Sequence, residues 1–279
     1  MKRILLLTDF SENSINAMNY ALKLFYNDFC DFFVLNVQDS LSYTSDDLIT
    51  SKSGESLYEV LILENKNKLK RIVNHLKLNA NDRLHTFKSI IDYDVFVDAV
   101  KQTVAKEDIG YVVMGTNGAS NLSEAIMGSN ALKILRYIDC NTLVVPEGYQ
   151  YKKPDKILLA LDTDDYADHK TVVDIMELIR NLGASINVVR FISSDNNIQS
   201  KINLDRELLL ELINENKFTY KTVSNVPLSN ILVDESLSKD AGIITLVGQF
   251  KGFFERLFSD SSKTKISKNL ILPLMIFHH

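Results

Sequence analysis

Short runs of apolar residues alternate along this chain with longer stretches in which apolar residues recur every three or four positions. The first run, KRILLLT at residues 2–8, predicts a buried strand, and helical spacing follows it at Ile15, Met18, Leu22 and Phe25. Further strands are expected at residues 32–37, 84–91, 111–114 and 142–145, and helices at residues 57–76, 93–105 and 129–138. Strands alternating with helices predict the α/β class, with a parallel sheet covered on both faces.

The second half of the chain repeats this pattern. The first strand of each half ends in an aspartate, Asp9 or Asp162, and we align Gly115 with Gly248 after the fourth strands. The second half is expected to hold strands at residues 156–161, 186–191, 219–223, 243–247 and 273–277, and helices at residues 167–182, 204–214, 231–237 and around Lys265.

A polar connector, EGYQYKKPD at residues 147–155, separates the two repeats. Connectors of this composition are typical of domain boundaries. We therefore expect one domain at residues 1–146 and a second at residues 155–279.

Composition and charge narrow the function classes. Hydrophobic residues make up 46% and charged residues 24% of the chain, which is typical of a folded globular protein. The net charge is −5 and neither half is basic, so recognition of nucleic acid through its phosphates is disfavoured, except by a local basic patch. The longest apolar runs, at residues 4–7 and 270–277, are shorter than the roughly 20 residues of a membrane span, so we expect no membrane segment.

The amino-terminal apolar run is interrupted by Asp9 before a signal peptide would be complete, which predicts a cytoplasmic protein. Cys30 and Cys140 lie far apart and form no CxxC pair, so buried reduced thiols are expected. The five scattered histidines support no metal site.

The candidate chemistry lies in one loop, where Gly115, Gly118 and Gly128 follow the spacing Gly-x2-Gly-x9-Gly-Ser. A glycine after a buried strand permits a positive φ and lets an anion approach the backbone. The pair Gly128-Ser129 opens a helix, whose amino-terminal amides attract phosphate. Tight turns and a helix cap are the structural alternative, but the complete spacing between a strand and a helix favours a phosphate-containing ligand.

This loop, the opening ILLLTDFSENS and the closing strand NTLVVP resemble the universal stress protein family in its ATP-binding branch, and the duplication resembles its tandem-domain members. The resemblance implies two Rossmann-like domains related to the adenine nucleotide alpha hydrolases. Each would be an open five-stranded parallel sheet of order 3-2-1-4-5. It also implies that ATP, which Mg²⁺ could accompany, binds in the first domain between the ends of strands one and four.

The resemblance assigns a role to each site residue. Asp9 would lie by the adenosine, the backbone of Val37 would face adenine, and Met114 would lie under the nucleoside. Gly115 and Gly118 would approach the ribose and phosphates, and Gly128, Ser129 and Asn130 would hold the phosphate tail. From position alone, Asp9 is equally well explained as a helix N-cap or turn residue, and Val37 as core.

The second domain departs from this pattern. Gly248 and Gly252 are separated by three residues, and Asp260-Ser261 stands where the first half has Gly128-Ser129. A carboxylate there would repel a phosphate, so we expect this site to be empty or weak. The acidic run at residues 162–165 is interpreted as capping a helix, and no metal is assigned to it.

Binding is better supported than catalysis, since the loop lacks the Gly-Lys-Ser/Thr of a P-loop. The leading hypothesis is a regulatory ATP-binding stress protein. The alternatives are a slow ATP hydrolase or self-phosphorylating enzyme, and an interaction scaffold with a vestigial nucleotide site. The resemblance also implies that the two halves pair about a pseudo-twofold axis through their fifth strands, and a homodimer of the tandem chain is a further expectation.

Overall fold

One sheet of ten strands organises the part of the chain that the computed structural model describes, which is residues 1–38, 57–116, 128–161, 168–192, 203, 205, 218–224, 240–248 and 272–278. The first half contains β1 (Lys2–Thr8), α1 (Glu12–Leu24), β2 (Cys30–Val37), α2 (Leu57–Asn79), β3 (His85–Asp92), α3 (Phe96–Lys106), β4 (Tyr111–Gly115), α4 (Ser129–Tyr137) and β5 (Asn141–Val145). The second half contains β6 (Lys156–Leu161), α5 (His169–Leu182), β7 (Ser185–Ile192), β8 (Phe218–Ser224), β9 (Ile243–Val247) and β10 (Leu274–Phe277). The α/β class expected from the sequence is confirmed.

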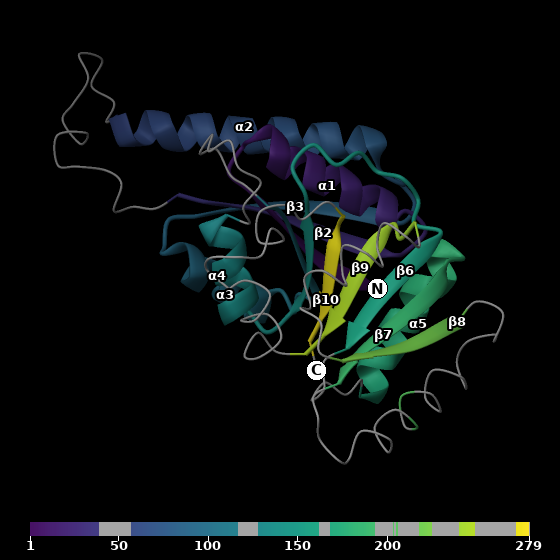
Figure 1. Cartoon of the computed structure of the whole chain (residues 1–279). Coiled ribbons are helices and arrows are strands. Elements are labelled where there is room, and N and C mark those ends of the chain that lie inside the picture. The colour runs from purple at the N-terminus through teal and green to yellow at the C-terminus, as the bar shows by residue number, and fades with distance from the viewer. Residues whose placement is uncertain are drawn as a thin grey trace.

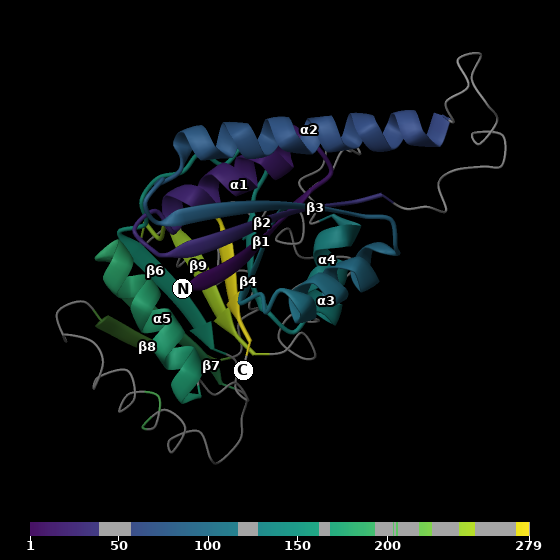
Figure 2. The same ribbon diagram turned by 180° about the vertical axis from the view of Figure 1, so that it is seen from behind.

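The strand order is β3-β2-β1-β4-β5-β10-β9-β6-β7-β8 (Figures 1 and 2). Neighbouring strands run parallel within each half, and β5 runs antiparallel to β10 where the halves meet. Each half therefore has the order 3-2-1-4-5 in its own numbering, and the two orders mirror each other across the β5–β10 junction. The expected helices at residues 204–214, 231–237 and around Lys265 fall almost entirely outside the described residues.

Apolar side chains fill both faces of this sheet. Residues 4–7 of β1 are almost fully buried, as a strand between two layers of helices requires. Helices α1, α2 and α5 pack on one face of the sheet, whereas α3 and α4 pack on the other. The two faces thus have separate cores.

Local capping explains where two helices begin. Helix α1 begins after Ser11, whose side chain accepts a hydrogen bond from the Ser14 amide, and α5 begins after Asp168, which caps the Thr171 amide. Helix α3 begins at Phe96, three residues later than expected from the sequence. The carboxylates of Asp92 and Asp94 accept hydrogen bonds from backbone amides just before it, which holds a turn there in place of a helix.

The strand register corrects the alignment of the two halves. Ile4 pairs with Tyr111 in the first half, and Ile157 pairs with Ile243 in the second. The amide of Thr116 donates to the Val145 carbonyl, and the amide of Gly248 donates to the Phe277 carbonyl. The alignment of Gly115 with Gly248 is therefore wrong by one residue: Gly248 matches Thr116, and Val247 matches Gly115.

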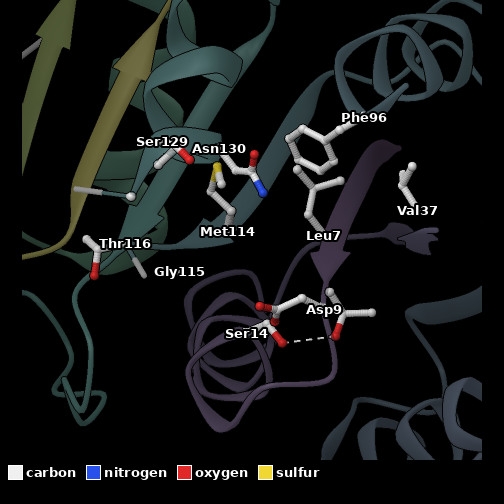
Figure 3. A pocket seen from close by; sticks show the side chains of 13 residues that line it. Leu7, Asp9, Ser14, Val37, Phe96, Met114, Gly115, Thr116, Ser129 and Asn130 are labelled. Atoms are coloured by element: carbon white, nitrogen blue, oxygen red, sulfur yellow. Dashed lines mark hydrogen bonds between the residues drawn. The ribbon is translucent and has the colours of Figure 1, made fainter. Parts of the chain in front are cut away.

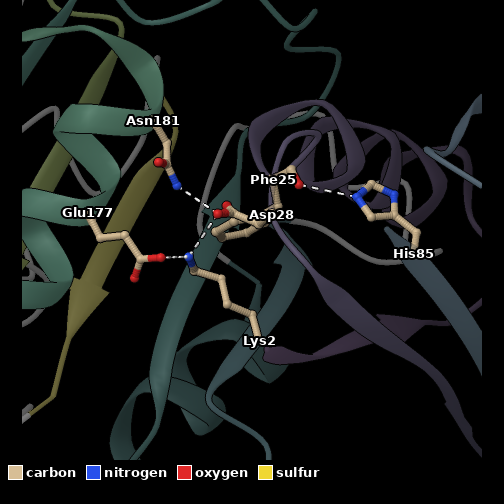
Figure 4. Close-up of polar contacts among 6 residues, drawn as sticks. All are labelled: Lys2, Phe25, Asp28, His85, Glu177 and Asn181. Carbon is tan, nitrogen blue, oxygen red and sulfur yellow. Dashed lines mark hydrogen bonds and ion pairs between the residues drawn. The ribbon is translucent and has the colours of Figure 1, made fainter. Parts of the chain in front are cut away.

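A polar cluster joins the two halves near the amino end of β1 (Figure 4). The Lys2 ammonium lies 2.6 Å from the Glu177 carboxylate on α5 and 3.1 Å from the Asp28 carboxylate. Asn181, also on α5, donates to Asp28 at 2.7 Å. Burial disfavours the Lys2 charge, but its bonds to Glu177 and Asp28 outweigh that and raise the pKa of Lys2. The cluster fixes α5 against the loop between α1 and β2.

His85 at the start of β3 is buried and has both ring nitrogens engaged (Figure 4). The Asn81 amide donates to Nδ1 at 3.2 Å, so Nε2 carries the proton and donates to the Phe25 carbonyl, also at 3.2 Å. Burial lowers the pKa of His85, although the Phe25 carbonyl and the charge of Asp28 oppose this. The geometry therefore requires the neutral imidazole.

Candidate functional site

A pocket of about 320 Å³ opens at the carboxyl ends of β1, β2 and β4, between the starts of α3 and α4 (Figure 3). In open parallel sheets this is the edge at which ligands bind. The lining residues are Leu7, Thr8, Asp9, Ser14, Val37, Phe96, Met114, Gly115, Thr116, Gly128, Ser129, Asn130 and Ala131. The volume lies in the range typical of small-molecule sites.

The Asp9 carboxylate forms the acidic corner of the pocket. It accepts hydrogen bonds from the Ser11 amide at 3.1 Å and from the Ser11 hydroxyl at 2.6 Å. Because Ser11 is the cap of α1, the interpretation of Asp9 as the helix N-cap is wrong. Asp9 instead stabilises a turn through these hydrogen bonds. In this turn Phe10 adopts a φ of 67°, which is uncommon for a residue other than glycine.

Two buried hydroxyl groups lie beside this corner. Thr8 and Ser14 are hydrogen bonded through their side-chain oxygens at 2.9 Å (Figure 3). The buried Asn36 on β2 donates to the Thr8 carbonyl at 2.8 Å. These bonds fix the end of β1 to both α1 and β2.

Gly115 ends β4 and lies beside Asn13 of α1. A Cβ atom on Gly115 would lie 2.6 Å from Nδ2 of Asn13 and 2.8 Å from its Cγ. Among the described glycines φ is positive at Gly148, Gly183 and Gly248, so Gly115 does not use the positive φ that glycine permits. A larger residue would be crowded here, because the Asn13 amide occupies the space of a side chain.

The amino terminus of α4 forms the side of the pocket opposite Asp9. Gly128 is the N-cap and supplies no side-chain cap, and the first turn contains no acidic residue. The first amides of an α-helix have no carbonyl partner within the helix, and they carry the positive end of its dipole. Since Ser129, Asn130 and Ala131 line the pocket, this end of the helix favours an anion there.

Apolar side chains form the remaining wall. Leu7, Val37 and Phe96 gather on one side in Figure 3, and Met114 lies between them and α4. Phe96 was not anticipated from the sequence. It begins α3 just after β3, whose carboxyl end lies at the same edge of the sheet as the pocket. A pocket with one apolar wall, one carboxylate and one helix amino terminus can hold a flat apolar group, a polyol and an anion together.

Seven of the eight site residues expected from the sequence line this pocket: Asp9, Val37, Met114, Gly115, Gly128, Ser129 and Asn130. The eighth, Gly118, lies outside the described residues. Sequence reasoning missed Thr8, Ser14 and Thr116, whose hydroxyl groups are common in caps and turns and carry no distinctive spacing.

The matching positions in the second half have different chemistry. By the strand register, Leu161 matches Thr8 and Arg190 matches Asn36, while Val247 replaces Gly115. The buried Arg190 donates through Nε to Asp205 at 2.9 Å, and the Tyr220 hydroxyl donates to the same carboxylate at 3.1 Å. The predictions for Asp162, Gly252 and Asp260-Ser261 concern residues outside the described part of the chain.

The fold and the pocket define an open α/β protein with a pocket at the carboxyl edge of its sheet. The model of the universal stress protein family matches residues 1–146, and the chain therefore belongs to this family. A search of curated proteins found no match. In the part of the chain that the structure describes, no helix is long and apolar enough to cross a membrane.

Solved structures support the same fold over nearly the whole chain. A universal stress protein from Archaeoglobus fulgidus DSM 4304 is 16% identical, with a TM-score of 0.70 over 99% of this chain and 96% of that one. A functionally unknown protein from Pseudomonas aeruginosa PAO1 is 11% identical, with a TM-score of 0.57 over 99% of this chain and 92% of that one. The cytoplasmic domain of a prokaryotic cation chloride cotransporter is 10% identical, with a TM-score of 0.55 over 99% of this chain and 94% of that one. At these identities the likeness concerns the fold alone.

Proposed function

We propose that this protein is a stress-response regulator that binds ATP in the pocket of its first half, and that nucleotide occupancy changes its conformation or its association. The observation that carries the proposal is the convergence of separate segments on one pocket. The residues named from the sequence that line it come directly after β1, from β2, from β4 and from the start of α4. Spacing along the chain alone would not bring them together.

The chemistry of the lining residues fits ATP. The first-turn amides of α4, at Ser129 and Asn130, would hold phosphate oxygens without any cationic side chain. The Asp9 carboxylate would accept a hydrogen bond from a ribose hydroxyl, and Val37 and Phe96 would contact the base. Among the described residues no group of three or more acidic, histidine or cysteine side chains could hold a metal ion. Mg²⁺ would therefore be held mainly by the triphosphate and water.

Regulation by binding is favoured over catalysis because Asp9 is the one ionisable side chain among the described lining residues. A hydrolytic reaction usually needs a positioned base and a group that stabilises the developing charge. The cytoplasmic location and the homodimer stay predictions. The cytoplasmic location is consistent with Cys30 and Cys140, which are buried and form no disulfide bond.

We further propose that residues 1–146 and 155–279 are two domains related by a pseudo-twofold axis, with a degenerate site in the second. The mirrored strand orders support the first part. The turns before β4 and β9 support it too, since Asp108 and Asp240 have φ of 49° and 51°. The Val247 side chain where the first half has Gly115 supports the second part.

Isothermal titration with ATP tests the site. Wild-type protein is expected to bind one ATP per chain, and Asp9→Ala and Gly118→Val are expected to bind at least about tenfold more weakly, the loss of about 1.4 kcal/mol of interaction. Asp82→Ala removes an exposed carboxylate before β3, at the opposite edge of the sheet, and should bind like wild type. Absence of binding by wild type, or equal binding by all variants, would refute the assignment. Two ATP molecules per chain would refute the degenerate second site.

A further inference from the structure

The part of α2 that follows Glu64 is strongly basic in an otherwise acidic protein. Residues 65–81 contain five lysines and arginines and no aspartate or glutamate, whereas the whole chain carries a net charge of −5. The cations are Lys66, Lys68, Lys70, Arg71 and Lys77. The nucleotide pocket uses none of them.

The helix separates its cations from its core residues. Leu69, Val73 and Leu76 are buried as α2 packs against α1, β2 and β3. Lys66 and Lys70, in contrast, are exposed. At about 100° per residue, Lys66, Lys70 and Lys77 project within about 40° of one another and span roughly 16 Å of the helix. Figures 1 and 2 show α2 beside α1 on one face of the sheet, where it covers β2 and β3 and leaves its other side facing outward.

Most of these cations are available to a partner. Lys68 pairs with Glu64 at 2.7 Å, and its ammonium lies 5.9 Å from the centre of the Phe10 ring. Within the described residues, Lys66, Lys70, Arg71 and Lys77 form no ion pair. Like charges this close repel one another, so an anionic partner that covers them would relieve a local repulsion.

Exposed apolar side chains accompany the lysines. Leu63 is 60% exposed and Leu78 is 85% exposed; at about 100° per residue Leu63 projects about 20–60° and Leu78 about 80–120° from the three lysines, on the side away from the buried Val73. Tyr26 and Phe29 are also exposed, in the loop after α1. The Asn81 amide group beyond the end of α2 donates to the Tyr26 carbonyl at 3.3 Å, so this loop lies beside the end of the helix.

We propose that the outer face of α2 docks the protein on an anionic phospholipid bilayer. Lysines beside a membrane surface gain roughly 1 kcal/mol each from anionic headgroups, and leucine, tyrosine and phenylalanine side chains partition into the interface. A nucleic acid would also attract the lysines, but its backbone has no partner for the exposed Leu63 and Leu78. The apolar residues therefore favour lipid. The docking is peripheral and uses none of the residues that line the pocket.

Co-sedimentation with vesicles tests this proposal on the full chain. Wild type is expected to bind vesicles of phosphatidylglycerol and phosphatidylcholine, to bind phosphatidylcholine alone weakly, and to dissociate as salt is raised. The double variant Lys66→Glu/Lys70→Glu should lose at least about tenfold in vesicle affinity. Its matched control, Lys152→Glu/Lys153→Glu, makes the same change of charge in the exposed connector and should lose less than about twofold.

Two further measurements separate lipid from nucleic acid. Leu78→Gln keeps the charge and should weaken vesicle binding, while binding of polyuridylic acid should stay weak in every protein. Failure of wild type to bind anionic vesicles would overturn the proposal, as would equal losses in the two double variants. Tighter binding of polyuridylic acid than of vesicles at the same salt would reassign the face to nucleic acid. Unchanged vesicle binding by Leu78→Gln would overturn the contribution of the apolar side chains, which is the ground for preferring lipid. All proteins should have the same circular dichroism spectrum, since the substituted side chains are exposed.

Discussion

Replacing Gly115 with alanine should destabilise the first half of the sheet, because the Asn13 amide occupies the space that a Cβ atom needs. The new atom would lie 2.6 Å from Nδ2 of Asn13 and 2.8 Å from its Cγ. Carbon contacts are optimal at about 3.5 Å or more, so the amide would have to retreat by roughly 0.8 Å. Asn13 is only 7% exposed, which leaves it little room to do so.

The expected cost follows from two opposing effects. Over-packing a buried site costs about 1–3 kcal/mol. Alanine also restricts the unfolded chain relative to glycine, which stabilises the folded state by about 0.4–1 kcal/mol. We therefore expect Gly115→Ala to lower the free energy of unfolding by about 1–2 kcal/mol.

Urea titration followed by circular dichroism measures this change, and a double-mutant cycle assigns it to one contact. Asn13→Ala removes the obstructing amide, so Gly115→Ala should cost about 1 kcal/mol less in that background. Gly110→Ala is the control, since its Cβ would meet only the Arg3 carbonyl oxygen, at 3.8 Å. It should stay within about 0.5 kcal/mol of wild type. Additive effects of Gly115→Ala and Asn13→Ala, or a cost for Gly110→Ala equal to that of Gly115→Ala, would refute the steric reasoning.

Three other predictions test the fold. Because the folded-state pKa of His85 is lowered from 6.5, its neutral form contributes stability that is lost as pH falls from 6.5 toward that lower pKa. In urea titrations between pH 7 and 5, His85→Gln should therefore reduce the change of the free energy of unfolding with pH, and an unchanged pH dependence would contradict this. Burial raises the pKa of Cys30 and Cys140 to about 12, so both thiols should resist iodoacetamide at pH 8 in native protein and react in urea, as mass spectrometry would record. Lys2→Met leaves Asp28 without its cation and should cost about 1–3 kcal/mol in the same titration; no change would mean that the cluster joining the halves adds no stability.

The strands could be predicted because each buried strand is a continuous apolar run. The run at residues 156–161 was expected as a strand and is β6, and the run at residues 243–247 is β9. The start of α3 could not be predicted from apolar spacing alone. Carboxylates before Phe96 bind backbone amides and hold a turn, which is a competition between side chain and helix that the pattern does not reveal.

The pocket was predictable where its chemistry lies in the backbone. Gly128 and Ser129 were expected from the glycine spacing. The groups that favour an anion there are backbone amides at the start of α4, so they do not depend on the identity of the surrounding side chains. Phe96 and Ser14 belong to segments whose local sequence says nothing of a ligand, and only the topology brings them to the pocket. The alignment error at Gly248 has the same origin. Gly115 and Gly248 were aligned because both are glycines after a fourth strand. The hydrogen bonds between strands instead make Gly248 equivalent to Thr116.

The antiparallel pairing of β5 with β10 limits how a homodimer could form. Leu274 pairs with Val144 and Ile276 with Thr142, so β5 has a neighbour on both sides and offers no open edge to a second chain. Among the described strands, β3 and β8 are the edges of the sheet. Lys88 lies within β3, and a charged side chain on an edge strand disfavours further strand pairing. A homodimer of this chain could therefore not form by pairing β5, because the fifth strands of the two halves pair with each other within the chain, as the family resemblance implies.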